Sequence, residues 1–337
     1  MRASPEKKPT YCCIAIIERC FLHCRICYKW KDDINSRDPR EPKIWQWKNF
    51  IDSLERLVDI PFQINFAGGE ALMHHDTLEL VRYASNKGFA TLLASNGWLI
   101  NEDMAKKIND SGLSIISLSL DGIKEETHDF IRGAKGSYRS VLKAIESLKK
   151  YCPGLKITIC TLISALNLEE LIDLVSWVTN NDTIFGIGFQ AVTQPFNTPI
   201  EDEWYLNPEY RYLWPTNIHR VNSVMDAMID RVKNNKNNKV GNPASQFFAF
   251  KAYFKNPGSF IKKSVTCHLD DTAINITPTG DIFFCFYKDP IGNIKEDNIS
   301  EIWYSKKNEE ARCHIKSCKK NCQAIVNCNY KEDEINL

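Results

Sequence analysis

The stretch Cys20-Phe21-Leu22-His23-Cys24-Arg25-Ile26-Cys27 places three thiols in one short segment, four and then three positions apart. Loops with this spacing let several sulfur atoms converge on one centre, and thiolates are soft ligands that suit iron–sulfur clusters or zinc. A cubane cluster contains four irons, so three local cysteines would leave one iron open to another ligand. A closed structural zinc site needs a fourth ligand, for which His23 is the local candidate. These residues alone leave both metals open.

The composition is that of an ordinary globular protein. The chain has 337 residues, which gives a prior of about two domains and allows a substantial core. Hydrophobic residues make up 43% of the chain and charged residues 25%. Forty-three basic and 42 acidic side chains leave a net charge of +1, which argues against nucleic acid or a membrane surface as an electrostatic partner.

The N-terminal segment and the cysteine count together indicate a reducing compartment. Residues 1–10 are polar and lack the apolar core of a signal peptide, and no apolar run approaches membrane-spanning length. We therefore expect a cytoplasmic protein that does not enter the membrane. In a reducing cytosol, thirteen cysteines indicate metal sites rather than a disulfide framework.

Short apolar runs alternate with segments of helical periodicity through the first part of the chain. The predicted strands are 11–17, 63–67, 90–94, 114–120, 156–162 and 184–190. The predicted helices are 44–57, 77–87, 102–109, 137–150 and 168–179. Six strands alternating with helices imply a parallel α/β sheet covered by helices, which fits either an open doubly wound sheet or a partial barrel.

The loops that carry chemistry all follow predicted strands. They are the cysteine loop 20–27, Gly68-Gly69-Glu70, Ser95-Asn96-Gly97 and Asp121-Gly122. In both architectures, functional sites lie at the carboxyl ends of the strands. Because these ends share one rim, the loops predict a single site there.

A second group of cysteines follows a segment rich in proline and aromatic residues. Two helices are predicted within 191–266, one at 218–233 and one to about Lys255, with Asn242 as cap and Pro243 in the first position. Beyond them, segments 273–277 and 282–286 form a predicted hairpin. Six cysteines between position 267 and position 328 indicate a second metal centre.

Together these motifs resemble those of the radical S-adenosylmethionine (SAM) enzymes. Cys20, Cys24 and Cys27 match the family signature C-x3-C-x2-C, whose cysteines hold a 4Fe–4S cluster that binds SAM. In that family the position before the third cysteine is usually aromatic and packs near the adenine. This chain has Ile26 there, and the neighbouring Tyr28 is the candidate for that contact.

Further motifs match in the family's order. Gly68-Gly69-Glu70 resembles the motif that receives the SAM amino group, in which glycines let the backbone approach a ligand and the carboxylate complements the ammonium. Asn96 lies in a turn similar to the one that contacts the ribose. Ser119 and Arg132 correspond to residues that hold the SAM carboxylate, a task that suits the guanidinium fork.

The C-terminal cysteines are similar to the SPASM/twitch extension of the same superfamily. Full SPASM domains carry about seven cysteines for two auxiliary clusters, whereas twitch domains carry about four for one. With six cysteines here, the resemblance implies one auxiliary 4Fe–4S cluster, with two as the alternative. The implied ligands are Cys267, Cys285, Cys318 and Cys322, with Cys328 as the competing ligand. Cys313 falls outside the pattern as a packing residue, although Cys313 or Cys328 near the cavity could instead donate a hydrogen atom to a substrate radical.

The resemblance also implies a fold and a domain organisation. We expect a partial (β/α)6 TIM-type barrel in residues 11–190, a helical connector in 191–266 and a SPASM/twitch domain with a β-hairpin in 267–337. Polar residues on strands and near strand ends are candidates to line the substrate pocket. They are Asn65, Thr158, Gln190 and Gln194.

The implied activity is reductive cleavage of SAM to a 5′-deoxyadenosyl radical, which abstracts a hydrogen atom from the substrate. An external one-electron reductant such as flavodoxin or ferredoxin would start the reaction. The leading substrate is a ribosomally synthesised peptide, although the 19 residues before Cys20 leave no room for a peptide-binding winged-helix domain. Dehydrogenation or epimerisation of a sugar, an aminoglycoside or another small molecule is the alternative. A non-catalytic iron–sulfur or zinc protein is a remote alternative, because it would need no SAM-binding rim.

Overall fold

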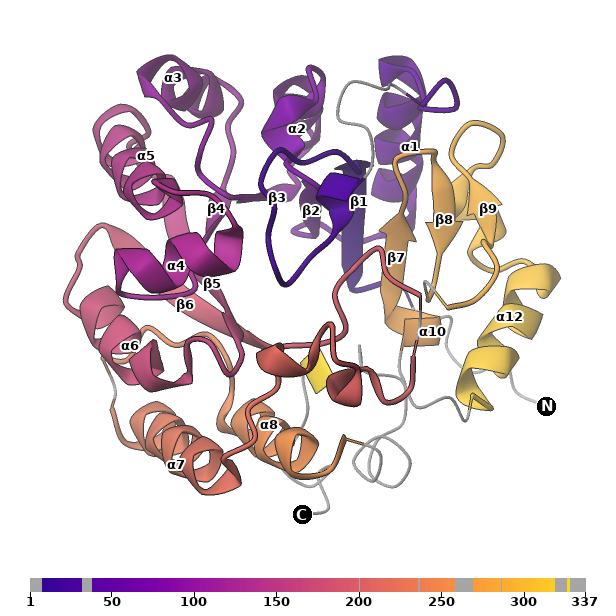
Figure 1. The fold of residues 1–337 in the computed structure, drawn as a ribbon. Helices are drawn as coiled ribbons and strands as arrows, with labels where there is room; N and C mark the ends of the chain where they lie inside the picture. Colours follow the sequence, from indigo (N-terminus) through magenta and orange to yellow (C-terminus); the bar gives the residue numbers. More distant parts are fainter. Residues whose placement is uncertain are drawn as a thin grey trace.

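A curved sheet contains the six predicted strands in chain order (Figure 1). The computed structural model describes residues 8–31, 38–199, 201–235, 237–257, 269–285, 287–318 and 326–327. The six strands are β1 (Tyr11–Ile17), β2 (Gln63–Gly68), β3 (Ala90–Ser95), β4 (Ile115–Ser119), β5 (Lys156–Ile163) and β6 (Ile184–Ala191). Each pairs in parallel with its neighbours, which confirms the predicted α/β class.

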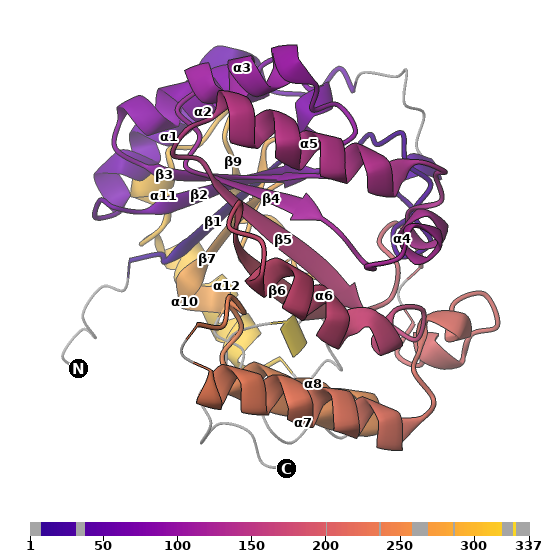
Figure 2. The same ribbon diagram turned by 90° about the vertical axis from the view of Figure 1, so that its left-hand side faces the viewer.

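Helices cover the outer face of this sheet, as the periodicity predicts. They are α1 (Ile44–Leu57), α2 (Thr77–Asn86), α3 (Glu102–Asp110), α4 (Glu125–Arg132), α5 (Ser137–Tyr151) and α6 (Leu171–Thr179). Of these, only α4 was not predicted. It is short and mostly polar and buries only His128 and Ile131, so it produces no apolar periodicity. Figure 2 shows α4 at the end of the sheet toward which the arrows of β4 and β5 point.

Alternation along the strands separates the two faces of the sheet. Side chains such as Ile64, Leu93 and Ile116 are fully buried beneath the helices. The intervening side chains, such as Ser117 and Cys160, are only half-buried and face the concave side. The apolar core therefore lies between sheet and helices, and the concave side remains accessible.

The C-terminal hairpin joins the same sheet. β7 (Ala273–Ile276) pairs in parallel with β1, and β8 (Asp281–Phe283) pairs antiparallel with β7. A short strand, β9 (Gly292–Asn293), pairs with β8 and completes a nine-stranded sheet. The hairpin prediction is confirmed, and the sheet continues across the expected start of the C-terminal domain.

The remaining elements are short, apart from two connector helices and the C-terminal helix α12. They are η1 (Lys29–Lys31), η2 (Ala71–Met73), η3 (Leu168–Glu170), η4 (Trp204–Leu206), η5 (Arg211–Leu213), α7 (Ile218–Asn234), α8 (Ala244–Lys255), α10 (Leu269–Thr272), α11 (Ile299–Ile302) and α12 (Lys306–Lys316). None of the helices in the described ranges is long and apolar enough to cross a membrane.

Side chains from the C-terminal half cover the exposed edge of β6. The Asn242 amide accepts a hydrogen bond from the Phe189 N–H at 2.6 Å and donates one to the Phe189 carbonyl at 2.9 Å. The Asn327 amide makes the same pair of bonds with Ala191, at 2.7 and 3.0 Å. The expectation that Asn242 caps α8 is wrong, because its amide pairs with the open strand edge and Pro243 precedes the helix instead.

Candidate metal and cofactor site at the strand ends

The three thiols of the cysteine loop are neighbours at the carboxyl end of β1. Cys24 is buried, Cys20 and Cys27 are half-buried, and all three are free. Burial raises the pKa of each thiol, to about 12 for Cys24, and the nearby Arg132 guanidinium opposes the rise. A metal bound here must therefore displace protons from the thiols.

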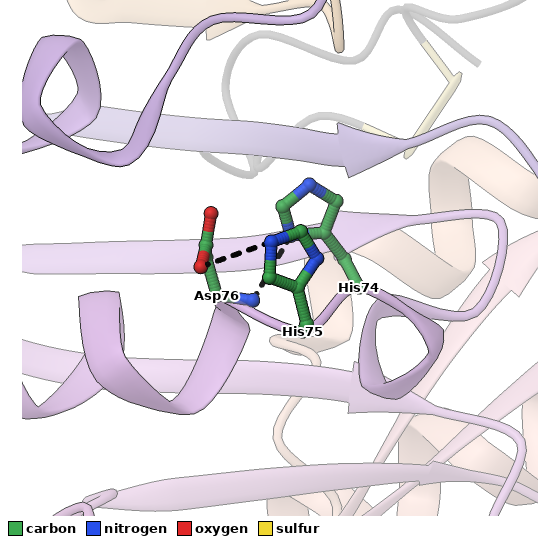
Figure 3. A group of neighbouring side chains, drawn as sticks. All are labelled: His74, His75 and Asp76. Carbon is green, nitrogen blue, oxygen red and sulfur yellow. Dashed lines mark hydrogen bonds and ion pairs between the residues drawn. The ribbon is translucent and has the colours of Figure 1, made fainter. Parts of the chain in front are cut away.

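A compact group of potential ligands lies nearby, in the turn before α2. Figure 3 shows His74, His75 and Asp76, with the two rings stacked at 4.9 Å between centroids. The His75 Nε2 lies 3.3 Å from the Asp76 carboxylate, and the Asp76 N–H donates to His74 Nδ1 at 3.2 Å. In the described part of the chain, this is the only set of three ligand atoms within 4.8 Å of one another. At least one pair of sulfur atoms in the cysteine loop therefore lies more than 4.8 Å apart.

This separation of the sulfur atoms bears on the two metals that the sequence left open. Around one tetrahedral zinc ion, with Zn–S bonds of about 2.3 Å, the sulfur atoms would lie about 3.8 Å apart. The proposed fourth ligand, His23, is exposed, and its ring packs on Trp30 at 4.7 Å between centroids. The loop thus fits a cluster of several irons better than a single zinc ion.

The end of α4 holds the cysteine loop in place. The Arg25 N–H donates to the Ile131 carbonyl at 2.9 Å. Gly133 ends the helix with φ +63°, and a Cβ there would lie 2.0 Å from the His23 carbonyl oxygen. Only glycine allows this approach. The unpredicted helix is therefore what positions the loop from outside the sheet.

The glycine pair Gly68-Gly69 brings two strand ends together. A Cβ at Gly68 would lie 2.1 Å from the Ile17 carbonyl oxygen, and one at Gly69 would lie 2.0 Å from that of Arg19. The Gly69 N–H donates to the Ile17 carbonyl at 2.7 Å. The sequence suggested close approach to a ligand, whereas the close neighbour in the structure is the end of β1.

The Glu70 carboxylate links the loops that follow β2 and β3. It accepts hydrogen bonds from Ser95 Oγ at 2.9 Å, from the Asn96 N–H at 2.8 Å and from the Leu72 N–H at 3.3 Å. Burial raises the pKa of Glu70, and these donors oppose the rise. The Asn96 side-chain amide lies 3.9 Å from the Cys20 sulfur. Glu70 and Asn96 are therefore brought together beside the cysteine loop.

Arg132 reaches the same place from the last turn of α4. Its Nη2 lies 2.6 Å from Oδ2 of Asp121, and its guanidinium also neighbours Cys24 and Cys160. Among the described residues, its Nε has no hydrogen-bond partner although it is buried. An unsatisfied buried donor is unusual and fits an anionic ligand that would supply the acceptor.

The remaining site residues of the barrel occupy different surroundings. Ser119 lies on the concave side at the end of β4, paired in register with Cys160 of β5. Sequence reasoning passed over Cys160, and strand alternation was the signal that would have placed it inward.

Tyr28 is buried in an aromatic cluster, with ring centroids 5.7 Å from Trp30 and 5.9 Å from Tyr210. Tyr28 thus packs against the connector.

The predicted auxiliary-cluster ligands are only partly covered by the structure. Cys285 is half-buried just after β8, whereas Cys318 and Cys313, the latter on α12, are exposed. Cys267, Cys322 and Cys328 lie outside the described residues. The auxiliary ligand set therefore stays a prediction.

Comparison with known proteins adds two family matches. Residues 14–178 match the family model described as the radical SAM superfamily. Residues 267–329 match the model described as an iron–sulfur cluster-binding domain, SPASM. Together the two models cover the barrel up to α6 and most of the cysteine-rich C-terminal region.

Two curated proteins and one solved structure illustrate the similarity. The chain is 34% identical over 171 residues to the Fe-coproporphyrin III synthase of Methanosarcina barkeri, covering 51% of this chain and 41% of that protein. It is 36% identical over 129 residues to the mycofactocin maturase MftC of Mycolicibacterium smegmatis, covering 38% of this chain and 31% of MftC. The crystal structure of Streptococcus suis SuiB bound to SAM matches with a TM-score of 0.69 at 16% identity, covering 95% of this chain and 74% of that one. The last comparison shows a shared fold.

Proposed function

Because the chain belongs to the radical SAM superfamily of enzymes and carries a SPASM domain, we propose that it abstracts a hydrogen atom from a ribosomally synthesised peptide. The observation that carries the proposal is the three-thiol loop, whose cysteines neighbour one another and the Arg132 guanidinium with its unsatisfied buried donor. When bound, the cluster and SAM supply the chemistry, since one-electron reduction cleaves SAM to methionine and a 5′-deoxyadenosyl radical that takes the hydrogen atom.

The residues of the rim divide the task of holding these groups. Cys20, Cys24 and Cys27 would ligate the cluster as thiolates. Arg132 and Ser119 would bind the SAM carboxylate, for which a guanidinium is well suited. Asn96 would contact the ribose. Glu70 keeps the loops after β2 and β3 together and places its charge near Cys20, where an ammonium group would be stabilised.

The concave face supports a peptide as the substrate class. Side chains that point inward from the middle of the strands are uncharged, and several are small or carry amides or hydroxyls. Examples are Asn65, Ser117 and Thr158. Such a surface can hydrogen-bond to peptide groups without a charge requirement. The similarity to MftC, named a maturase, favours the same substrate class.

The C-terminal region would supply electron transfer. We propose that Cys267, Cys285, Cys318 and Cys322 would hold one auxiliary 4Fe–4S cluster, which would supply an acceptor for the electron left after hydrogen abstraction. An external flavodoxin- or ferredoxin-type donor would deliver the first electron.

The test uses anaerobically reconstituted protein with SAM, dithionite and the short peptides encoded beside its gene. We expect 5′-deoxyadenosine and a mass change in one peptide, both measured by mass spectrometry. The variant with Cys20, Cys24 and Cys27 all changed to Ala should form no 5′-deoxyadenosine while keeping its C-terminal iron. Undiminished cleavage by this variant would refute the loop assignment. SAM cleavage without modification of any peptide would refute only the substrate class.

A small-molecule substrate is the second candidate, because the similarity to the Fe-coproporphyrin III synthase covers half of the chain. A porphyrin would be detected directly by a shift of its visible absorption on binding. Tight binding of Fe-coproporphyrin III, together with no peptide modification, would favour this candidate.

A further inference from the structure

Asp121, at the turn after β4, is the buried partner of Arg132. Its side chain is fully buried, and Oδ2 lies 2.6 Å from Nη2 of Arg132. Its Oδ1 accepts a hydrogen bond from the Leu162 N–H of β5 at 2.9 Å. The carboxylate is thus fixed by the sheet on one side and contacts the guanidinium on the other.

The backbone of Asp121 is fixed as well. Its N–H donates to His128 Nδ1 at 3.1 Å, and its carbonyl accepts from the Asn167 side chain at 2.8 Å. These contacts come from α4 and from the loop before η3. Because β5, α4 and the loop before η3 all hold Asp121, its carboxylate gives the long Arg132 side chain a rigid reference point.

We propose that Asp121 is a positioning residue, which orients the Arg132 guanidinium so that its free Nε–H meets the carboxylate of SAM. The inference rests on the proposed function. An arginine side chain has several rotatable bonds, so fixing one nitrogen in advance removes part of the ordering cost of binding. The buried Nε without a partner marks where the acceptor is missing.

A purely electrostatic role predicts the opposite result. Asp121 is negative, so its charge alone would weaken the attraction of Arg132 for another carboxylate. Removing that charge should then strengthen SAM binding. If orientation of Arg132 dominates, removing the Asp121 charge should weaken SAM binding. The direction of the change therefore decides between the two explanations.

The experiment compares binding of SAM and of decarboxylated SAM, which lacks the carboxylate, to the anaerobically reconstituted protein. Wild-type protein should bind SAM at least about tenfold more tightly than decarboxylated SAM, because a hydrogen bond to a charged group is lost. In Asp121→Asn, SAM affinity should fall about tenfold while affinity for decarboxylated SAM stays unchanged, so the preference for the carboxylate should shrink about tenfold. The change in the electron paramagnetic resonance spectrum of the reduced cluster on SAM addition provides an activity-independent readout.

Asp129→Asn is the matched control. Asp129 lies on the same helix and accepts hydrogen bonds from Ser137 and from the Tyr138 N–H, both at 2.8 Å. The Asp129→Asn variant should have a lower free energy of unfolding but the same preference for SAM over decarboxylated SAM. If Asp121→Asn does not fold, Asp121→Glu keeps the charge and displaces it by one methylene. Asp121→Glu should also reduce the preference for SAM over decarboxylated SAM.

Each result has a distinct meaning. Unchanged or tighter SAM binding by Asp121→Asn, or by Asp121→Glu where only that variant folds, would overturn the positioning role. A wild-type protein that binds both ligands equally would overturn the Arg132 assignment and this inference with it. A wild-type protein that binds neither ligand would overturn the proposed function itself.

Discussion

His128 illustrates how a single buried side chain is tuned by its surroundings. It is almost fully buried, and its Nδ1 accepts the Asp121 N–H, which requires an unprotonated nitrogen at that position. Burial lowers the pKa of His128 to about 4, and the charge of Arg132 adds to this effect. The residue is therefore neutral in the folded protein at neutral pH.

This pKa predicts a pH dependence of stability. An unfolded histidine takes up its proton near pH 6.5, whereas folded His128 does so only near pH 4. Between these values the unfolded state binds more protons, so the free energy of unfolding falls as the pH is lowered, by up to about 3 kcal/mol in total. His128→Asn keeps an acceptor and removes the titration. Anaerobic urea unfolding from pH 7 to pH 4 should show a steeper decline for wild type than for the variant, and parallel curves would contradict the assignment.

Single residues differ in how far the sequence predicts them. Cys20, Cys24 and Cys27 are local in sequence, so their spacing alone predicts that they lie near one another, and in the structure the three thiols are neighbours. The pairing of Asp121 with Arg132 depends on a polar helix that hydrophobic periodicity does not detect. Two of the three donors to Glu70, Ser95 and Asn96, come from the end of the next strand, and no local pattern specifies such a contact.

At the scale of elements, the parallel strands were predicted to within one or two residues, because buried β-branched runs flanked by turn residues are a strong signal. The parallel pairing of β1 with β7 was not predicted. Pairing between strands that are distant in sequence depends on the whole fold, and the sequence of neither strand indicates which strand it pairs with. The same holds for the Asn242 side chain, whose partner is the backbone of β6.

The close approach of β1 and β2 yields a prediction for this pair of elements. Gly69→Ala places a Cβ 2.0 Å from a backbone carbonyl oxygen, which cannot move without separating the strand ends. We expect a loss of unfolding free energy of at least about 1–3 kcal/mol, typical of overpacking, together with reduced iron in the loop cluster. Thermal unfolding and iron analysis would measure both.

Gly188→Ala on β6 is the control for this change. A Cβ at Gly188 meets nothing within 4 Å, so the variant should unfold like wild type and keep its iron. Equal behaviour of the two variants would show that the crowding at Gly69 has no energetic consequence.

At the scale of the whole molecule, the number of auxiliary clusters is the main prediction. In the variant lacking Cys20, Cys24 and Cys27, iron content should approach about four per chain with one auxiliary cluster and about eight with two. Further single changes to Ala should damage the cluster spectrum at Cys267, Cys285, Cys318 and Cys322, and leave it intact at Cys313 and Cys328. Loss of the spectrum in Cys328→Ala, with an intact spectrum in Cys318→Ala, would replace the proposed ligand set.

The covering of the β6 edge limits how a peptide can be recognised. Backbone groups of Ile187 form hydrogen bonds with those of Lys239 and Gly241, both at 2.8 Å. The side-chain amides of Asn242 and Asn327 form hydrogen bonds with the backbone of Phe189 and Ala191 in the same way. The outward N–H and C=O groups along this edge are thus already engaged, and β-augmentation, in which a peptide adds a further strand to a sheet, has no template there. The peptide substrate that we propose would therefore not be bound by strand addition at β6, and contacts on the concave face would select it by its side chains.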